Sequence, residues 1–196
     1  DTLGEVKVPA DHMWGAQTQR SSENFKIGAR MPEEIIHAFA VLKKCTALAN
    51  LAEGKLSEEK AKVIAESCDE ILAGKWNGEF PLVVYQTGSG TQTNMNLNEV
   101  IANRATELLG GKKGEYLCHP NDHVNRSQST NDVIPTAGRL TVLDYATELE
   151  ANVSELTAAL DRKAVEFNDI VKMGRTQLED AVPIRLGQGF AAYSSG

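Results

Sequence analysis

The chain has 196 residues, of which 41% are hydrophobic and 24% charged, and its formal net charge is −7. This length is enough for one or two domains with a packed core. The acidic balance argues against nucleic acid or an anionic membrane as the main partner, because either would require a basic face. The chain has no run close to the roughly eighteen apolar residues of a membrane span, and no signal-peptide pattern opens it.

The cysteines indicate a reducing compartment. Cys45, Cys68 and Cys118 are widely spaced and form no Cys-x-x-Cys pair. Free thiols of this kind are typical of intracellular proteins. We therefore expect a cytoplasmic protein, or a protein of the mitochondrial matrix if the source is eukaryotic.

Residues 1–25 contain short apolar pieces between turn residues. Val6 and Val8 alternate with charged neighbours, which predicts a small strand or one arm of a hairpin. The segment Trp14–Ser21 is polar behind one large aromatic residue. It fits a surface loop anchored by Trp14 as well as it fits a functional segment.

Two core helices follow, to which we assign no catalytic or binding role. The first begins at Pro32, with Glu33 and Glu34 in its first turn. The second begins after Ser57 as N-cap and ends at Gly74. The apolar residues expected to line the buried faces are Ile35, Phe39, Leu42 and Ala49 in the first helix and Val63, Ile64, Ile71 and Leu72 in the second.

The first polar loop precedes a third helix. A short apolar run leads into Gly88-Ser89-Gly90, and a helix is predicted from near Thr91 to Leu109. Asn94 and Asn98 lie one turn apart, so their amides share a face near the helix start. The glycines are not a P-loop, because no Gly-Lys-Ser/Thr follows. The apolar stripe of this helix is Leu97, Ile101, Ala105 and Leu108.

The second polar stretch is His119–Asp132, in which almost every side chain is polar. It is too polar for a core strand and too rich in Asn, Ser and Asp for a helix interior. It predicts a structured loop that delivers Ser129, Thr130 and Asn131 to the N-terminus of the next helix. Unpaired N–H groups and the helix dipole suit an anion there. The alternative is that Asn131 or Asp132 simply caps the helix.

A long helix is predicted from near Pro135. Its apolar residues form a long seam along one face, which the helix cannot bury by itself. We therefore expect neighbouring helices to pack on this seam at shallow crossing angles, in this chain or in another. The seam is formed by residues that recur mainly at steps of four and three: Val142, Ala146, Leu149, Val153, Leu156, Leu160, Ala164, Phe167 and Val171.

A third polar stretch, 172–180, follows the long helix and leads into another apolar segment. The chain ends at Gly196 inside a continuing helical pattern, which is a poor place for a domain to end. We expect an N-terminal domain over residues 1–128. Residues 129–196 then form the beginning of a helical-bundle domain.

The three polar stretches share one chemistry, which is hydrogen-bond donation by hydroxyl and amide groups. Combined with two helix N-termini, such donors suit a small dianion with a carboxylate at each end. A reaction that builds negative charge beside a carboxylate would use them fully. The candidates are Ser89, Thr91 and Asn94 in the first stretch, Ser129, Thr130 and Asn131 in the second, and Arg175, Thr176 and Gln177 in the third.

A metal centre is disfavoured. Cys118, His119, Asp122 and His123 lie close together in the sequence, but no matching ligand pair occurs elsewhere. No Ser-His-Asp arrangement can be defended from spacing. We expect no metal and no other cofactor.

Four motifs occur jointly and in one order along the chain: Gly88–Asn96, His119–Asn125, Ser127–Asp132 and Gly174–Pro183. Through these motifs the chain resembles the fumarase/aspartase superfamily over its whole length. The resemblance implies an all-α fold in which a small N-terminal domain with a short β-hairpin precedes a long central helical bundle. It also implies a homotetramer built through the central helices, active sites made from three subunits, and reversible elimination from a small dicarboxylate to give fumarate.

Different segments resemble different branches of this superfamily. Ser129–Asn131 and Gly174–Gln177 are more similar to aspartate ammonia-lyases. Fumarases usually carry Ser at the position of Thr130 and a histidine at that of Gln177, and a glutamine cannot replace acid–base help worth about 10²–10⁴ in rate. The segments similar to class II fumarases are Asp1–Asp11, Trp14–Ser21, Thr91-Gln92 and His119-Pro120.

The resemblance favours fumarate hydratase, which interconverts fumarate and L-malate in the tricarboxylic acid cycle. The alternatives are aspartate ammonia-lyase, which converts L-aspartate to fumarate and ammonia, and an inactive structural relative. The serine that acts as the superfamily's catalytic base lies on a later mobile loop that these 196 residues do not contain. We expect this piece to be the N-terminal part of a longer enzyme and to be inactive alone.

The resemblance also assigns roles to residues. Thr91, Ser129, Thr130 and Asn131 would bind the substrate carboxylates and orient the leaving group, and Thr176 and Gln177 would contribute from a second subunit. Ser89 and Thr176 are further substrate-binding candidates. His119, Asn121 and Asp122 match a secondary dicarboxylate site near the active-site entrance. The catalytic candidates are Thr91, Ser129, Thr130, Asn131, Thr176 and Gln177.

Overall fold

The computed structural model describes residues 3–196, which divide into two compact units at Thr141/Val142. Asp1 and Thr2, which open the first fumarase-like segment, lie outside the described residues. The chain is mainly helical with one two-stranded antiparallel hairpin, which confirms the predicted fold class.

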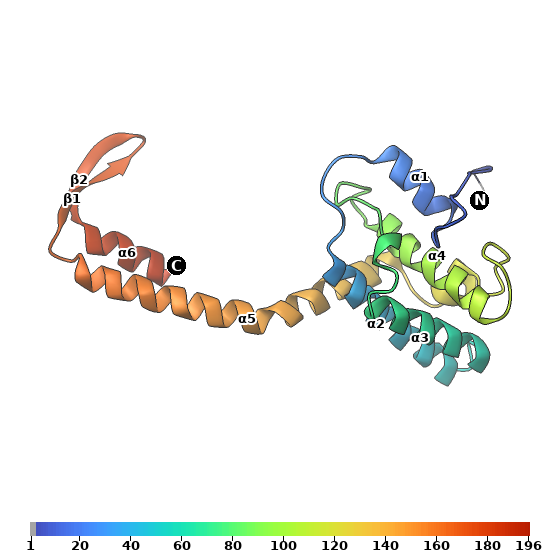
Figure 1. Cartoon of the computed structure of the whole chain (residues 1–196). Coiled ribbons are helices and arrows are strands. Elements are labelled where there is room, and N and C mark those ends of the chain that lie inside the picture. Colours follow the sequence, from blue (N-terminus) through green and yellow to red (C-terminus); the bar gives the residue numbers. More distant parts are fainter. Residues whose placement is uncertain (1–2) are drawn as a thin grey trace. The chain divides into compact units, whose positions relative to one another are not determined.

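The first unit contains four helices and the first turns of a fifth. Helices α2 and α3 lie side by side, and α4 packs against them (Figure 1). Fully buried side chains at their meeting faces include Phe39, Ile64 and Ile101. The elements are α1 (Ala16–Asn24), α2 (Glu33–Ala52), α3 (Glu58–Leu72), the short turn η1 (Asn77–Glu79), α4 (Thr91–Leu108), the short turn η2 (Pro120–Val124) and α5 (Thr130–Glu166).

The buried face of α2 differs from the predicted stripe. Ala49 is exposed, whereas Lys43 and Asn50 are buried. The prediction assumed that polar residues face solvent, and these two polar residues occupy the inward face. The buried residues of α2 are Ile36, Ala38, Phe39, Ala40, Lys43, Ala47 and Asn50.

Helix α2 is also long and apolar enough to cross a membrane by length and composition alone, a test that core helices of soluble proteins pass as well. It packs against α3 in the core of the first unit.

Helix α3 follows its predicted pattern. The Ser57 hydroxyl accepts a hydrogen bond from Lys60 N–H at 3.4 Å, as expected of an N-cap. A two-pronged ion pair joins the helix to α4, with Arg104 Nε 2.6 Å and Nη2 3.0 Å from the carboxylate oxygens of Glu70. The guanidinium holds the pKa of the Glu70 carboxyl down to about 2.

The segment Trp14–Ser21 is not a surface loop, because most of it forms α1. A carboxylate from α4 caps this helix: Glu99 accepts hydrogen bonds from Gly15 N–H, Gln17 N–H, Thr18 N–H and the Thr18 hydroxyl at 2.6–3.0 Å. A Cβ on Gly15 would lie 2.8 Å from this carboxyl group, so glycine is required for the approach. The polar residues that made this segment resemble a loop, such as Thr18, are therefore part of the helix.

The expectation of a strand around Val6 and Val8 is wrong. Residues 4–9 form no strand, and within the described chain the hairpin comes after α5. Alternating valines favour an extended backbone, but a strand also requires a partner segment, and none pairs with them among residues 3–196.

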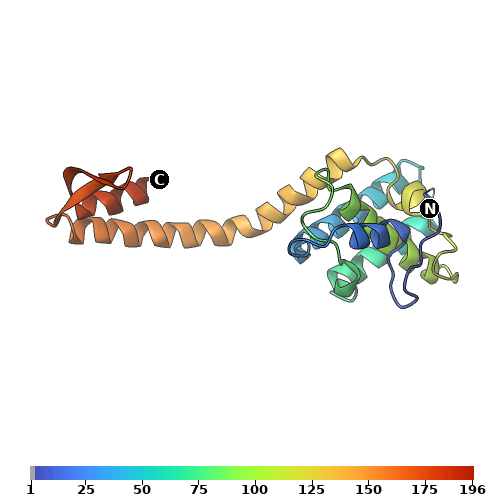
Figure 2. The same cartoon turned by 90° about the horizontal axis from the view of Figure 1, so that it is seen from above.

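The second unit contains the rest of α5, the hairpin β1 (Val171–Thr176) and β2 (Glu179–Arg185), and α6 (Leu186–Ser195). Helix α6 folds back along the end of α5 (Figure 2), where Phe167 and Phe190 pack with ring centroids 5.5 Å apart. The Ser194 hydroxyl donates to Asp161 Oδ1 at 2.5 Å. These contacts hold α6 against the end of α5.

The long helix differs from its prediction at both ends. It begins at Thr130 rather than near Pro135, because Ser129 caps it and the proline is accommodated inside. It ends at Glu166, so Val171 belongs to β1 instead of the seam. The seam itself is largely exposed: Val142 is 66%, Leu149 62% and Leu156 59% accessible.

The division between the units falls inside α5 because Val133 and Ala137 in its first turns are buried in the core of the first unit. The domain boundary expected after residue 128 concerns the whole protein and stays a prediction.

Candidate functional site

The first polar loop opens α4 through Gly90, whose φ of +69° is in the left-handed region. A Cβ here would lie 2.6 Å from Ile134 Cδ1 of α5, so glycine allows the loop to touch the next helix. The exposed hydroxyls of Ser89 and Thr91 are 3.0 Å apart. Both stand at the N-terminus of α4, where the helix dipole favours an anion.

Part of this helix start is already capped. Gln86 Oε1 accepts hydrogen bonds from the N–H of Thr93 at 2.9 Å and from the Thr93 hydroxyl at 3.0 Å. Within residues 3–196 no acceptor bonds the N–H groups of Thr91 and Gln92. Those two donors remain available to a bound anion.

The second polar stretch opens α5 as predicted, but the capping residue is different. Ser129 Oγ accepts from Asn131 N–H at 3.3 Å, so neither Asn131 nor Asp132 is the cap. The side chains of Ser129 and Asn131 are exposed, and that of Thr130 is half-buried. These three residues therefore display hydroxyl and amide groups at a second helix N-terminus.

The two helix starts lie against each other. Asn94 Nδ2 of α4 is 3.4 Å from Thr130 Oγ1 of α5, and Gly90 touches Ile134. Side chains from loops about forty residues apart are thus gathered in one place. The structure brings together Ser89, Thr91, Asn94, Ser129, Thr130 and Asn131.

A partly buried amide network lies behind these residues. Asn125 Oδ1 accepts from Asn94 Nδ2 at 3.1 Å and from Asn98 Nδ2 at 3.2 Å. The same oxygen accepts from Lys43 Nζ at 2.9 Å, and the ammonium also donates to Gln128 Oε1 at 2.8 Å. The shared face of Asn94 and Asn98 was correctly anticipated.

The sequence prediction missed Lys43 and Gln128 as supports of the site. One signal was available for Lys43. It occurs at steps of three and four from Phe39, Ala40 and Ala47, in the middle of an apolar helix face. A cation at such a position requires polar partners in the core.

His119, Asn121 and Asp122 form a separate turn. His119 Nδ1 accepts from Asn121 N–H and Asp122 N–H at 3.2 Å each, which assigns the ring proton to Nε2. His123 accepts from His119 N–H at 2.8 Å, and its Nε2 is 2.7 Å from Lys60 Nζ. Burial, then the Lys60 charge, lowers the pKa of His123. Among the described residues, none of these contacts reaches Thr91 or Ser129, and the secondary site stays a prediction.

Thr176 and Gln177 lie in the second unit, at the tip of the hairpin rather than in a loop. Thr176 pairs with Glu179, and the two turn residues Gln177 and Leu178 have φ values of +45° and +65°. This positive-φ turn matches the twist of a two-residue hairpin but is unusual without Asn or Gly. All three side chains are exposed, with Leu178 98% accessible. Their catalytic roles stay predictions.

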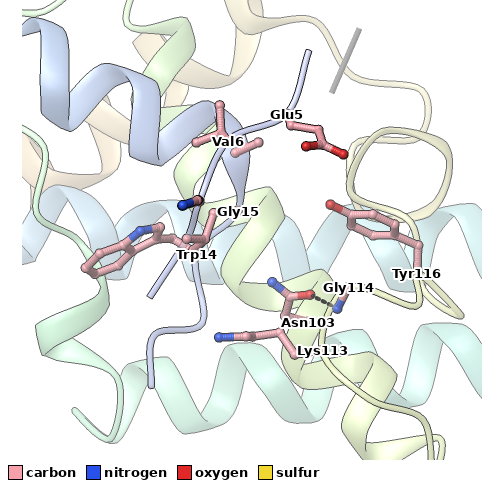
Figure 3. Close-up of a pocket in the computed structure, with 11 residues that line it drawn as sticks. Glu5, Val6, Trp14, Gly15, Asn103, Lys113, Gly114 and Tyr116 are labelled. Carbon is pink, nitrogen blue, oxygen red and sulfur yellow. Dashed lines mark hydrogen bonds between the residues drawn. The ribbon is translucent and has the colours of Figure 1, made fainter. Parts of the chain in front are cut away.

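A wide hollow of about 610 Å³ lies elsewhere in the first unit (Figure 3). Two of its polar side chains are already engaged: Asn103 Oδ1 accepts from Gly114 N–H at 3.1 Å, and Lys113 Nζ donates to the carbonyls of Pro9, Ala10 and His12. Along α4, Asn103 is about 18 Å from Thr91 at 1.5 Å per residue. The hollow does not belong to the hydroxyl and amide cluster.

A family model described as Lyase matches residues 4–195. The chain belongs to this lyase family. The match covers both units, including both polar loops and the hairpin.

Relatives within the family agree with this assignment. The chain is 58% identical over 199 residues to fumarate hydratase class II of Thermus aquaticus, covering 100% of this chain and 43% of that protein. It is 57% identical over 195 residues to fumarate hydratase class II of Bacillus subtilis (strain 168), covering 98% of this chain and 42% of that protein. The lyase chain thus spans less than half the length of these relatives.

A solved structure supports the fold. The crystal structure of fumarate lyase:delta crystallin from Brucella melitensis in native form matches with a TM-score of 0.79 at 46% identity, covering 100% of this chain and 45% of that one. Together with the family match, it confirms the predicted fumarase/aspartase superfamily.

In chemical terms, the first unit of this lyase offers positioned donors. Ser89, Thr91, Ser129, Thr130 and Asn131 carry neutral hydroxyl and amide groups, and two helix N-termini stand behind them. Such donors can bind carboxylates and stabilise charge that develops on their oxygens. None of these five side chains has the pKa of a general base near neutral pH.

Proposed function

We propose that the full-length protein is a carbon–oxygen lyase of the fumarate hydratase type, which adds water reversibly to fumarate to give L-malate. The observation that carries the proposal is the adjoining pair of helix N-termini, one beginning at Thr91 and the other preceded by Ser129. A dicarboxylate bound there would face donors that strengthen their hydrogen bonds as charge moves onto its carboxylate oxygens. The names of the relatives favour this reaction over others of the superfamily.

In this proposal the present chain supplies binding and orientation. Thr91, Ser129, Thr130 and Asn131 hold the substrate carboxylates, and Thr176 and Gln177 complete the site from a second subunit. The proton is removed from carbon by a group outside these 196 residues. The chain alone is therefore expected to bind weakly and to turn nothing over.

Aspartate ammonia-lyase is the second candidate, favoured by one residue in particular. Gln177, at the exposed hairpin tip, has no titratable group, whereas a hydratase of this superfamily usually has a histidine there. An amide can orient an amino group or a carboxylate but cannot relay a proton. An inactive structural relative would bind fumarate at none of these residues.

The decisive assay supplies the full-length protein with malate and with aspartate in parallel. We expect fumarate to form from malate, followed by its ultraviolet absorbance, and no ammonia to form from aspartate. Ammonia release from aspartate without turnover of malate would replace the proposal by the second candidate. No turnover of either acid, together with no fumarate binding by calorimetry, would identify an inactive relative.

We also propose that the full-length protein is a homotetramer assembled through α5. Leu149 and Leu156 lie on its apolar seam and are 62% and 59% accessible, a degree of exposure that an interface would remove. The double substitution Leu149→Asp and Leu156→Asp is expected to convert the tetramer to smaller species, measured by size-exclusion chromatography with light scattering. Val165→Asp, 80% accessible on the same helix but outside the seam, is the control and should leave the assembly intact.

The proposed compartment is the cytoplasm, or the mitochondrial matrix in a eukaryote. Cys45, Cys68 and Cys118 are all free thiols, in keeping with a reducing environment. The net charge of −7 supports a small-molecule substrate rather than nucleic acid or a membrane as the ligand.

A further inference from the structure

Lys43 is a cation in the core of the first unit. It is on α2 and is completely buried. Its Nζ donates to two neutral amide oxygens, Asn125 Oδ1 at 2.9 Å and Gln128 Oε1 at 2.8 Å. No carboxylate among residues 3–196 pairs with it. Burying an ammonium in this way costs free energy, so packing alone does not account for a lysine at this position.

Both acceptors belong to the segment that leads directly into Ser129. Gln128 Nε2 also donates to Val124 O at 2.9 Å, and Asn125 Nδ2 donates to Gln128 O at 3.4 Å. The ammonium therefore holds two side chains whose other ends grip the backbone of residues 124–128. The path of this backbone sets where Ser129, Thr130 and Asn131 stand.

A second connection runs through α4. Asn94 Nδ2 bridges Asn125 Oδ1 at 3.1 Å and Thr130 Oγ1 at 3.4 Å. Lys43 polarises the Asn125 amide that Asn94 also contacts, so its charge acts on the candidate substrate residues through one shared oxygen. The Oδ1 atoms of Asn94 and Asn98 are buried without a partner among the described residues. The stability of the network therefore depends on the hydrogen bonds donated by the Lys43 ammonium and by the two Nδ2 groups.

We propose that Lys43 is a positioning residue for the substrate-binding turn: its buried ammonium fixes Asn125 and Gln128, and through them holds Ser129, Thr130 and Asn131 in the geometry that receives a dicarboxylate. The inference rests on the proposed function for its substrate, but the contacts themselves do not. A residue acting in this way changes the rate without touching the substrate, because small displacements of binding groups are costly.

The same geometry makes the support sensitive to pH. Burial lowers the pKa of Lys43 to about 7, and the nearby Cys68 thiol of α3, whose own pKa burial raises to about 12, stays neutral in this range. The groups that face the ammonium from α4 and from residues 125–128 are uncharged amides. As pH rises through about 7, the ammonium loses its proton, and its hold on the two amide oxygens weakens.

The test uses the full-length protein with Lys43→Met, which keeps an unbranched side chain one atom shorter and removes its charge. We expect kcat/KM for malate to fall by about 10²-fold at pH 6. The ratio of wild type to variant should shrink as pH rises to 9, because the wild type then loses the charge as well. Lys44→Met is the matched control: Lys44 is next to Lys43 on α2 and pairs with exposed Asp69 of α3 at 2.6 Å, so the kinetics of this variant should match wild type.

Hydrogen exchange gives a readout that needs no activity. The amides of residues 125–131 should exchange faster in Lys43→Met than in wild type or Lys44→Met. If Lys43→Met does not fold, Gln128→Leu removes one acceptor and should give the same local effect more weakly. Unchanged exchange in this segment overturns the inference, and so does a loss of activity whose ratio is constant with pH. A wild-type protein inactive on malate and aspartate refutes the proposed function, while the exchange result still decides the role of Lys43.

Discussion

Replacing Thr91 by valine in the full-length protein is expected to lower kcat/KM for malate by about 10²–10³-fold, the usual effect of removing one positioned donor from a charge-stabilising site. The hydroxyl of Thr91 is exposed at the N-terminus of α4 and lies 3.0 Å from that of Ser89. Valine has the same shape but cannot donate to a carboxylate. The fall in kcat/KM should therefore reflect a missing hydrogen bond to the substrate and not a change in the stability of the fold.

The control for this substitution is Thr136→Val. The Thr136 hydroxyl donates to Asp132 O at 2.8 Å within α5, so it has no free donor for a ligand. This variant should keep kcat/KM within about twofold of wild type, because no donor to the substrate is lost. The fold should also be unaffected, since substitutions of this kind change stability by about 0.5 kcal/mol or less. Full activity of Thr91→Val, with fumarate binding unchanged, would remove the N-terminus of α4 from the active site.

The second large effect is expected at Glu99. Replacing it by leucine should destabilise the packing of α1 by about 4 kcal/mol, because hydrogen bonds to a charged group contribute about 1.5–3 kcal/mol each and part of that gain is offset by no longer burying a charge. The carboxylate caps α1 through Gly15, Gln17 and Thr18, whose N–H groups would lose their acceptor. Leucine fills similar space but accepts no hydrogen bond.

Trp14 provides a local probe for this prediction, since it precedes the cap and stacks on His12 with ring centroids 3.7 Å apart. In a Trp76→Phe background, its fluorescence should show α1 detaching at lower urea in Glu99→Leu than in the parent. Glu107→Leu, which breaks a half-exposed pair with Arg104 on the same helix, should shift the midpoint only slightly. Equal midpoints for Glu99→Leu and the parent would mean that α1 is held by other contacts.

Local signals in the sequence were enough to place several elements. Ser57 caps α3, and Gly90 opens α4 at Thr91, because capping and positive φ depend on one or a few residues. The polar stretch before α5 was correctly taken as a helix start. Its proximity to the loop before α4 was expected from the shared chemistry of the two stretches and from the family resemblance. The structure adds a distance of 3.4 Å between Asn94 Nδ2 and Thr130 Oγ1.

Signals that depend on distant residues were missed. Helix α1 is capped by a carboxylate 84 residues from Gly15 in the sequence, so its own polar composition resembled a loop. Lys43 lies on an apolar face of α2, but nothing near it in the sequence indicates that the amides of Asn125 and Gln128 accept its hydrogen bonds. The strand expected at Val6 found no partner, whereas Val171, taken as part of a helix seam, found one in Arg185.

The sequence by itself determined the lyase family, the helical class and the residue types available to bind a dicarboxylate, because motifs, periodicity and caps are written in neighbouring residues. Only the tertiary structure decided that two helix starts adjoin, that a buried ammonium stands behind one of them, and that Thr176 and Gln177 occupy a hairpin tip. These outcomes depend on which distant groups satisfy each other's hydrogen bonds when water is excluded, and a linear pattern does not contain that information.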